Sequence, residues 1–158
     1  MTVTLVRVEP TPTAVVAEAT SWDAFPSQWP ALLDEVWTFV RRARLEAGRN
    51  VMLYLDDVPH VEVGVEVRGP FAGEGRVVPS TLPGGLAATT VERGPPSREG
   101  IAKAHAAVKA WCSVHGHELA GTRWEVYDHW REEADPATFE TAVYWLLTTP
   151  APRPRSRG

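Results

Sequence analysis

Hydrophobic and polar residues alternate strictly from Val61 to Arg68, in the sequence VEVGVEVR. Every second residue is a valine, and the residues between are glutamate, glycine or arginine, which is typical of a β-strand with one buried face. Apolar or β-branched runs predict five further extended segments: residues 3–20 (interrupted by prolines), 51–57, 85–92, 122–130 and 139–147. The Gly- and Pro-rich stretch 69–85 has room for a short extended piece around 75–79.

Two stretches have the apolar spacing of amphipathic α-helices. The first runs from about Pro30 to Ala47, with Gly48 as the expected stop. The second runs from Arg98 to His115, where Ser97 is the expected N-cap and Gly116 the expected terminator. We expect the tryptophans on the apolar stripes of these helices, Trp37 and Trp111, to be core residues.

The order of these elements repeats, because each half of the chain reads strand, helix, strand, strand. Two such units, each with one helix covering one face of a sheet, predict an α+β protein. The remaining sheet faces would either meet or form a cleft. The tail 150–158 (PAPRPRSRG) lacks residues that form a core, and we expect it to be a disordered Pro/Arg segment.

The chain of 158 residues has the length of one domain, and its charge restricts the partners. It has 16 basic and 20 acidic residues, for a net charge of −4. Three of the basic residues are Arg153, Arg155 and Arg157, so residues 1–150 carry 13 basic against 20 acidic groups, a net of −7. Such a body disfavours direct nucleic-acid binding and favours neutral or cationic partners.

The sequence contains no motif for a disulfide, a metal site, a phosphate-binding loop or a catalytic nucleophile. The single cysteine, Cys112, excludes an internal disulfide and a cysteine-clustered zinc site, and the five histidines show no metal-ligand spacing. We find no phosphate-binding glycine loop and no nucleophile elbow, so we expect no metal and no cofactor. The N-terminus lacks a signal-peptide pattern and no apolar run reaches membrane length, so we expect a cytoplasmic protein without membrane contact.

The predicted strand 122–130 carries the most informative residues. Trp124 and Val126 share one face, and Glu125 and Tyr127 share the other. If Trp124 and Val126 pack under the helices, then Glu125 and Tyr127 point away from the helix layer. They would then point into the space that the sheets enclose.

A carboxylate beside a phenol, with aromatic residues around it, suits a planar cationic ligand. A buried carboxylate is costly unless a charge or hydrogen bonds compensate it, and a ligand cation would supply the charge. The alternative is that Glu125 lies in water at a sheet edge, or pairs with Arg123 or Arg131.

Four other residues are candidates for the same cavity. Tyr54 lies in the predicted strand 51–57, and Trp22 lies in an aromatic loop before the first helix. Trp145 is a candidate from the last strand, although its neighbour Tyr144 points to the opposite face and only one of the two can face a cavity. Glu66 is a candidate as the counterpart of Glu125 in the first half.

The chain resembles the GyrI-like small-molecule-binding domain, the effector-binding domain of multidrug-sensing transcription regulators that is related to the DNA gyrase inhibitor. The resemblance covers about residues 3–148. The residues that carry it are Gly94-Pro95, Trp111, Gly116, Gly121, Glu125-Val126-Tyr127 and Asp135-Pro136. It implies duplicated β-α-β-β units, with antiparallel sheets enclosing a ligand cleft. It places one domain over residues 1–149, with halves at about 3–68 and 83–148.

By this resemblance, Glu125 matches the central acidic residue of the family and Tyr127 the aromatic residue two positions on. In the family both lie in the cleft and meet lipophilic, often cationic ligands. The final strand, AVYWLLTTP, is more aromatic than is usual and is expected to narrow the cleft. No helix-turn-helix precedes residue 3, so we do not expect a one-component DNA-binding regulator.

Three functions follow as hypotheses. The first is a monomeric or homodimeric bacterial protein that binds small hydrophobic, aromatic or cationic molecules in its cleft, for sensing or sequestration. The second, implied by stand-alone proteins similar to this family, is a hydrolase of cyclopropane-bearing DNA-alkylating compounds that uses Glu125. The third is a protein-interaction module like the gyrase inhibitor.

Overall fold

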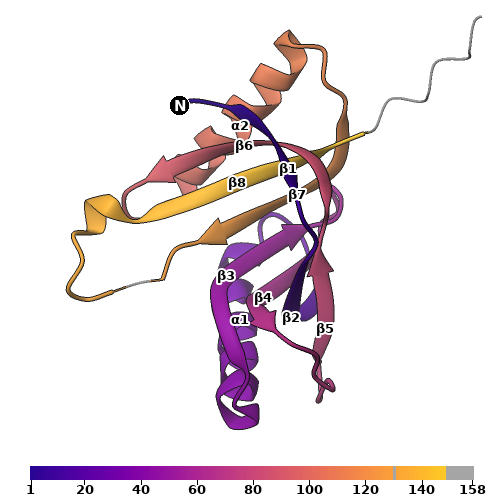
Figure 1. Ribbon diagram of the computed structural model, residues 1–158, viewed down its shortest axis with the longest axis vertical. Helices are drawn as coiled ribbons and strands as arrows, with labels where there is room; N and C mark the ends of the chain where they lie inside the picture. The colour runs from indigo at the N-terminus through magenta and orange to yellow at the C-terminus, as the bar shows by residue number, and fades with distance from the viewer. Residues whose placement is uncertain (130, 149–158) are drawn as a thin grey trace, which may run out of the picture.

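The computed structural model describes residues 1–129 and 131–148 as two helices and eight strands (Figure 1). The helices are α1 (Phe25–Ala43) and α2 (Arg98–Val114), and Pro136–Thr138 form one 3₁₀ turn. The strands are β1 (Thr4–Val8), β2 (Thr11–Ala19), β3 (Glu46–Tyr54), β4 (His60–Arg68), β5 (Val77–Leu82), β6 (Gly85–Arg93), β7 (Leu119–Tyr127) and β8 (Glu140–Leu147). No helix in the described residues is both long and apolar enough to span a bilayer.

All eight strands belong to one antiparallel sheet of order β1-β6-β8-β7-β3-β4-β2-β5. The predicted α+β class and the repeated β-α-β-β order are confirmed, as β2-α1-β3-β4 and β6-α2-β7-β8. The two halves share this single sheet because β3 pairs with β7 at its centre. Met52 and Glu125, each the seventh residue of its strand, lie directly opposite one another in that pairing.

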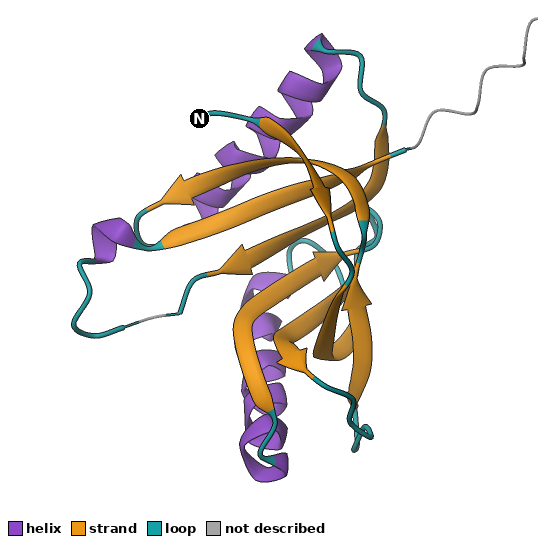
Figure 2. Cartoon of the chain, viewed as in Figure 1, coloured by secondary structure: helices purple, strands orange, loops and turns teal. Residues whose placement is uncertain are grey.

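Both helices cover the same face of the sheet, one in each half (Figure 2). Helix α1 packs its buried residues, such as Val36 and Val40, on the valines of β4. Helix α2 packs Ala104 and Val108 on β6 and β8. A third cluster lies on the opposite face of the sheet and consists of Val51, Leu53, Leu82, Ala87, Trp124 and Val126.

This arrangement corrects the expected orientation of the strand that carries Glu125. Trp124 and Val126 do not pack under the helices but lie in the cluster on the opposite face. Glu125 is on the helix side, because it pairs with Met52, which belongs to the core beneath α1. The space between the two helices, and not a space enclosed by bare sheet faces, is therefore where a site can form.

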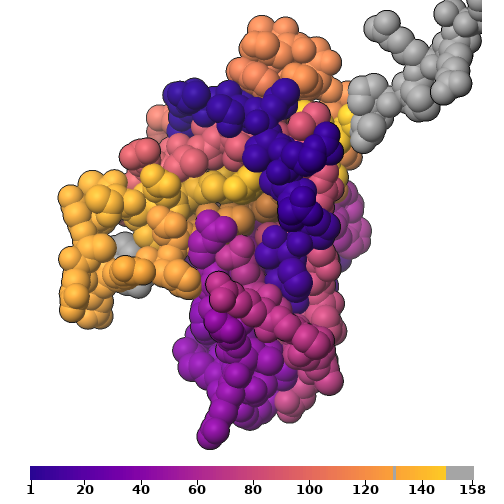
Figure 3. All heavy atoms as spheres, in the orientation of Figure 1, coloured from indigo at the N-terminus to yellow at the C-terminus, as the bar shows by residue number. Residues whose placement is uncertain are grey.

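The sheet curls until its two edges approach one another. Only two residues connect β1 at one edge to β2 beside the other edge, and only two connect β5 to β6. The two connections touch, because a Cβ placed on Gly84 would lie 2.6 Å from the ring of Pro10. As a result, β1 runs across the outside of the molecule from one half to the other (Figure 3).

The largest difference between the predicted and observed elements is at the first helix. It starts at Phe25 and ends at Ala43, so the expected stop at Gly48 is wrong. Arg44 ends the helix in a left-handed conformation (φ 54°), which lets Leu45 turn back onto the core while the polar run after it enters β3. The chain beyond Gly75 forms a full strand, β5, where only a short extended piece was expected. The tail 150–158 and Trp130 lie outside the described residues.

One glycine in β4 is required by a close approach of two strands. A Cβ at Gly64 would overlap the backbone carbonyl oxygen of Ala14 on β2. We expect Gly64→Ala to lower the free energy of unfolding by about 1–3 kcal/mol, because backbone must move to relieve the overlap. Gly48→Ala is the matched control, since its Cβ would come no closer than 3.0 Å to another atom, the carboxylate oxygen Oε1 of Glu66. Chemical denaturation measures both, and equal stability losses would contradict the prediction.

Candidate ligand-binding site

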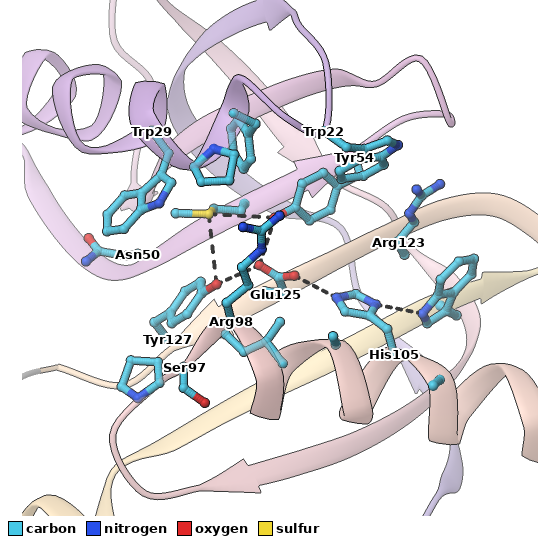
Figure 4. Close-up of a pocket in the computed structure, with 18 of the residues that line it drawn as sticks. Trp22, Trp29, Asn50, Tyr54, Ser97, Arg98, His105, Arg123, Glu125 and Tyr127 are labelled. Carbon is cyan, nitrogen blue, oxygen red and sulfur yellow. Dashed lines mark hydrogen bonds and ion pairs between the residues drawn. The ribbon is translucent and has the colours of Figure 1, made fainter.

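A cleft of about 1060 Å³ lies between the two helices, with β3 and β7 as its floor (Figure 4). Helix α1 and the segment before it contribute Trp22, Phe25, Pro26, Trp29 and Leu33. The floor and α2 contribute Asn50, Met52, Tyr54, Arg123, Glu125, Tyr127, Arg98, Ile101, Ala102, His105, Ala106 and Lys109. The remaining lining residues are Asp57, Pro96, Ser97, Asp128, Phe139 and Trp145. Of these 23 residues, 14 are aromatic or aliphatic and nine are polar or charged.

The carboxylate of Glu125 is on the floor of the cleft and is only 3% exposed. Its Oε1 accepts hydrogen bonds from the hydroxyls of Tyr127, at 2.6 Å, and Tyr54, at 3.0 Å. Its Oε2 lies 2.6 Å from Nε2 of His105 on α2. The carboxylate is thus held by side chains from both halves of the protein.

The tautomer of His105 follows from its second partner. The indole Nε1–H of Trp145 donates to Nδ1 of His105 at 2.9 Å. An indole N–H can only donate, so Nδ1 carries no proton and the proton is on Nε2. His105 is therefore a neutral imidazole that donates to Glu125.

Consequently, three neutral donors surround the Glu125 carboxylate. Within residues 1–129 and 131–148, no lysine or arginine forms an ion pair with it. The expected alternative, that Glu125 lies in water or pairs with Arg123 or Arg131, is wrong. Hydrogen bonds stabilise the carboxylate, but its charge is not balanced by a neighbouring cation.

The two phenols that contact Glu125 remain protonated. Burial is the largest cause that raises the pKa of Tyr54 and of Tyr127 above the usual value for tyrosine. The nearby charge of Glu125 raises both further, because a phenolate beside a carboxylate is unfavourable. The phenols act as fixed hydrogen-bond donors to Glu125.

Aromatic rings form the wall of the cleft next to Tyr54. The ring of Trp22 lies 5.5 Å from that of Tyr54, and Phe25 meets the same ring edge-on at 5.7 Å. The indole N–H of Trp22 donates to the carbonyl oxygen of Asp57 at 3.2 Å, which fixes the loop before α1 against the loop after β3. These rings offer broad apolar faces to a ligand.

Arg123 occupies one end of the cleft. It is 7% exposed, and its guanidinium carbon lies 5.0, 5.3 and 5.8 Å from the ring centroids of Trp145, Trp22 and Tyr54. Its Nη1 forms an ion pair with Asp57 at 2.9 Å. A cation among three rings is electrostatically favourable.

The structure brings together most of the residues selected from the sequence. Five of the six, Glu125, Tyr127, Tyr54, Trp22 and Trp145, line the cleft. Whether they bind a ligand remains a prediction. Tyr144, the neighbour of Trp145, faces the other side of the sheet and stacks on Trp124 at 5.2 Å.

Glu66 is the exception and does not line the cleft. The valines of its strand face α1, so Glu66 points to the opposite side of the sheet, where it pairs with Arg49 at 3.0 Å. It is also not the counterpart of Glu125, because Glu66 belongs to β4, whereas β3 corresponds to β7. The residue in the corresponding position is Met52.

Sequence reasoning missed His105 and the position of Arg123 in the cleft. His105 directly follows Ala104 on α2, at the border of the apolar stripe, where a polar residue can reach the sheet. A histidine at the border of an apolar helix stripe was therefore the one sign in the sequence that this residue could face the sheet. Its partners Glu125 and Trp145 are 20 and 40 residues away along the chain, so the sequence did not indicate the contacts themselves. In the part of the chain that the structure describes, no group of three or more His, Cys, Asp or Glu residues could hold a metal.

No protein-family model and no curated protein sequence matches this chain, whereas several solved structures do. The crystal structure of the EcmrR C-terminal domain has a TM-score of 0.74 at 17% identity, covering 93% of this chain and 97% of that one. The SAV2435 protein bound to tetraphenylphosphonium has a TM-score of 0.66 at 10% identity, covering 94% of both chains. A hydrolase from Listeria innocua has a TM-score of 0.60 at 10% identity, covering 92% and 91%.

The likeness to EcmrR is also seen in its complex with DNA. There the TM-score is 0.73 at 18% identity, and the match spans 92% of this chain but 57% of the EcmrR chain. At these identities the comparisons show the fold. The chain therefore has the α+β fold of the GyrI-like small-molecule-binding domain, as its resemblance in sequence implied.

Proposed function

We propose that the protein binds small aromatic cations in the cleft between α1 and α2, for sensing or sequestration. The observation that carries this proposal is the Glu125 carboxylate, which is buried on the cleft floor among neutral donors only. A buried charge is costly without a partner of opposite sign. A cationic ligand above Glu125 would provide that partner.

The size and lining of the cleft support a ligand of this kind. Its volume of about 1060 Å³ is that of a drug-sized binding site. The rings of Trp22, Phe25 and Trp29 on one side face the apolar residues of α2, such as Ile101, on the other. An aromatic cation would bury aromatic area on both sides and gain cation–π attraction. The solved complex of SAV2435 with tetraphenylphosphonium, an aromatic cation, supports the same reading for this fold.

The role of the charge can be tested with Glu125→Gln. We expect this variant to bind tetraphenylphosphonium about tenfold or more weakly, because the Coulombic attraction between the carboxylate and the phosphonium, roughly 3 kcal/mol at about 5–6 Å and an effective dielectric constant of about 20, is lost. Binding of the neutral triphenylphosphine oxide should change much less. Quenching of tryptophan fluorescence measures both affinities.

Glu66→Gln is the matched control, because Glu66 lies on the opposite face of the sheet and outside the cleft. It should leave both affinities unchanged. Equal losses for the cation and the neutral compound in Glu125→Gln would show that the side chain acts through shape and not through charge.

A second candidate is a hydrolase of strained electrophiles such as cyclopropane-bearing alkylating compounds. The favouring observation is that a carboxylate and two protonated phenols converge on one point of the cleft. Glu125 would take a proton from a water that attacks the strained carbon, and a phenol would donate a proton to the oxygen that receives the electron pair. A structurally similar Listeria innocua protein is described as a hydrolase.

Turnover distinguishes this candidate from simple binding. A hydrolase should release many equivalents of ring-opened product, and Glu125→Gln and Tyr127→Phe should each lower kcat about 100-fold or more. Product analysis by chromatography with mass detection gives the rate. Stoichiometric binding without product would exclude hydrolysis of the compound tested.

The raised pKa values of Tyr54 and Tyr127 predict a loss of stability in alkaline solution. Because the folded state holds these protons more tightly, the stabilisation is complete below about pH 10, the usual pKa of tyrosine, and declines as the pH rises above it. Denaturant unfolding between about pH 8 and 11 should show this decline. The double variant Tyr54→Phe/Tyr127→Phe should show a flatter profile, and identical slopes would contradict the assignment.

A further inference from the structure

Two cations converge on one aromatic ring at the end of the cleft, around Trp145. The guanidinium carbon of Arg123 lies 5.0 Å from the ring centroid of Trp145, and Nζ of Lys109 lies 5.5 Å from it. Arg123 comes from the floor strand β7 and Lys109 from helix α2, and both line the cleft. This end of the cleft is therefore positively charged, in contrast to the Glu125 position.

Arg123 is held rigidly but its hydrogen-bonding capacity is only partly used. The rings of Trp22, Tyr54 and Trp145 surround the guanidinium, and Nη1 donates to the carbonyl oxygen of Gly121 at 3.0 Å. The ion pair with Asp57 also uses Nη1. Among the described residues, Nε and Nη2 have no hydrogen-bond acceptor. A guanidinium can bind a carboxylate through two nitrogens at once, so these groups can receive an anion.

The partners of the two cations within the protein are weak. The Asp57 side chain is 92% exposed, so water competes strongly for it. Lys109 is exposed at the cleft mouth and forms no ion pair with any described residue. An anionic group entering the cleft could replace Asp57 beside the buried guanidinium at little cost.

We infer that this end of the cleft binds an anionic group of the ligand, so that the natural ligand is a planar aromatic zwitterion. The inference rests on the proposed function, because it adds a site for an anionic group to the cleft that is proposed to bind a cation at Glu125. Arg123 and Glu125 lie two residues apart on the same face of β7, about 7 Å along the strand. A molecule with a cationic ring system and a carboxylate, sulfonate or phosphate at about that spacing would satisfy both residues.

A matched pair of dyes tests the inference. Rhodamine B and its ethyl ester share the same cationic xanthylium ring and differ only in whether the carboxylate is free or esterified. We expect the wild-type protein to bind the free acid about tenfold more tightly than the ester, because the acid forms a charge-assisted pair with Arg123. Tryptophan quenching at fixed pH and ionic strength measures both affinities.

Three variants assign the preference to particular residues. Arg123→Gln should abolish the preference for the acid, and Lys109→Gln, at an exposed site, should reduce it about two- to fivefold. Asp57→Asn should strengthen binding of the acid, because it removes the competing carboxylate from Arg123. The last two variants lie at exposed positions, so they keep the test valid if Arg123→Gln fails to fold.

The outcomes separate this inference from the proposed function. Binding of neither dye would count against the cleft as a receptor for aromatic cations. Equal binding of acid and ester, or tighter binding of the ester together with a gain in ester affinity in Arg123→Gln, would overturn the anion site. If the ester binds more tightly and gains affinity in Arg123→Gln, then the guanidinium of Arg123 occupies the space between the rings of Trp22, Tyr54 and Trp145 that a cationic ligand would otherwise fill.

Discussion

The hydrogen bonds to one buried carboxylate join the two halves of this protein. Tyr54 and Tyr127 on the floor strands and His105 on α2 all donate hydrogen bonds to the carboxylate of Glu125. Trp145 donates to the other ring nitrogen of His105 and so fixes the tautomer that can donate to Glu125. Loss of any donor would leave acceptor capacity unmet at a site that water hardly reaches. The two halves therefore meet at a polar centre that is set within an apolar cleft.

Internal duplication explains where this centre lies but not what it contains. The pairing of β3 with β7 sets Met52 against Glu125 at equivalent positions of the two units. A perfectly repeated sequence would place two carboxylates or two thioethers there. The protein instead has one of each, so the cleft floor is charged at Glu125 and apolar and polarisable at Met52. A ligand with one charged end therefore has one preferred orientation.

The sequence was sufficient to predict the repeated element order, the strand of alternating valines, and helix α2 with its Ser97 cap. It also selected Glu125, Tyr127 and Tyr54, because period-two alternation separates them from their apolar neighbours. Alternation cannot say which face meets the helices, since both faces of a central strand are buried here. The orientation is set by the register with β3, which is a long-range property. The contacts of His105 and the position of Arg123 in the cleft were missed because they too depend on residues that are distant in the sequence.

The path of β1 has a consequence for the order in which the chain assembles. This strand precedes the whole first unit in sequence but pairs with β6 of the second, so that Thr4 lies opposite Thr89. During synthesis its partner emerges only after the first helix and four further strands have left the ribosome. A strand that is made before the first unit thus acquires its partner only with the second unit, and such distant pairing slows folding.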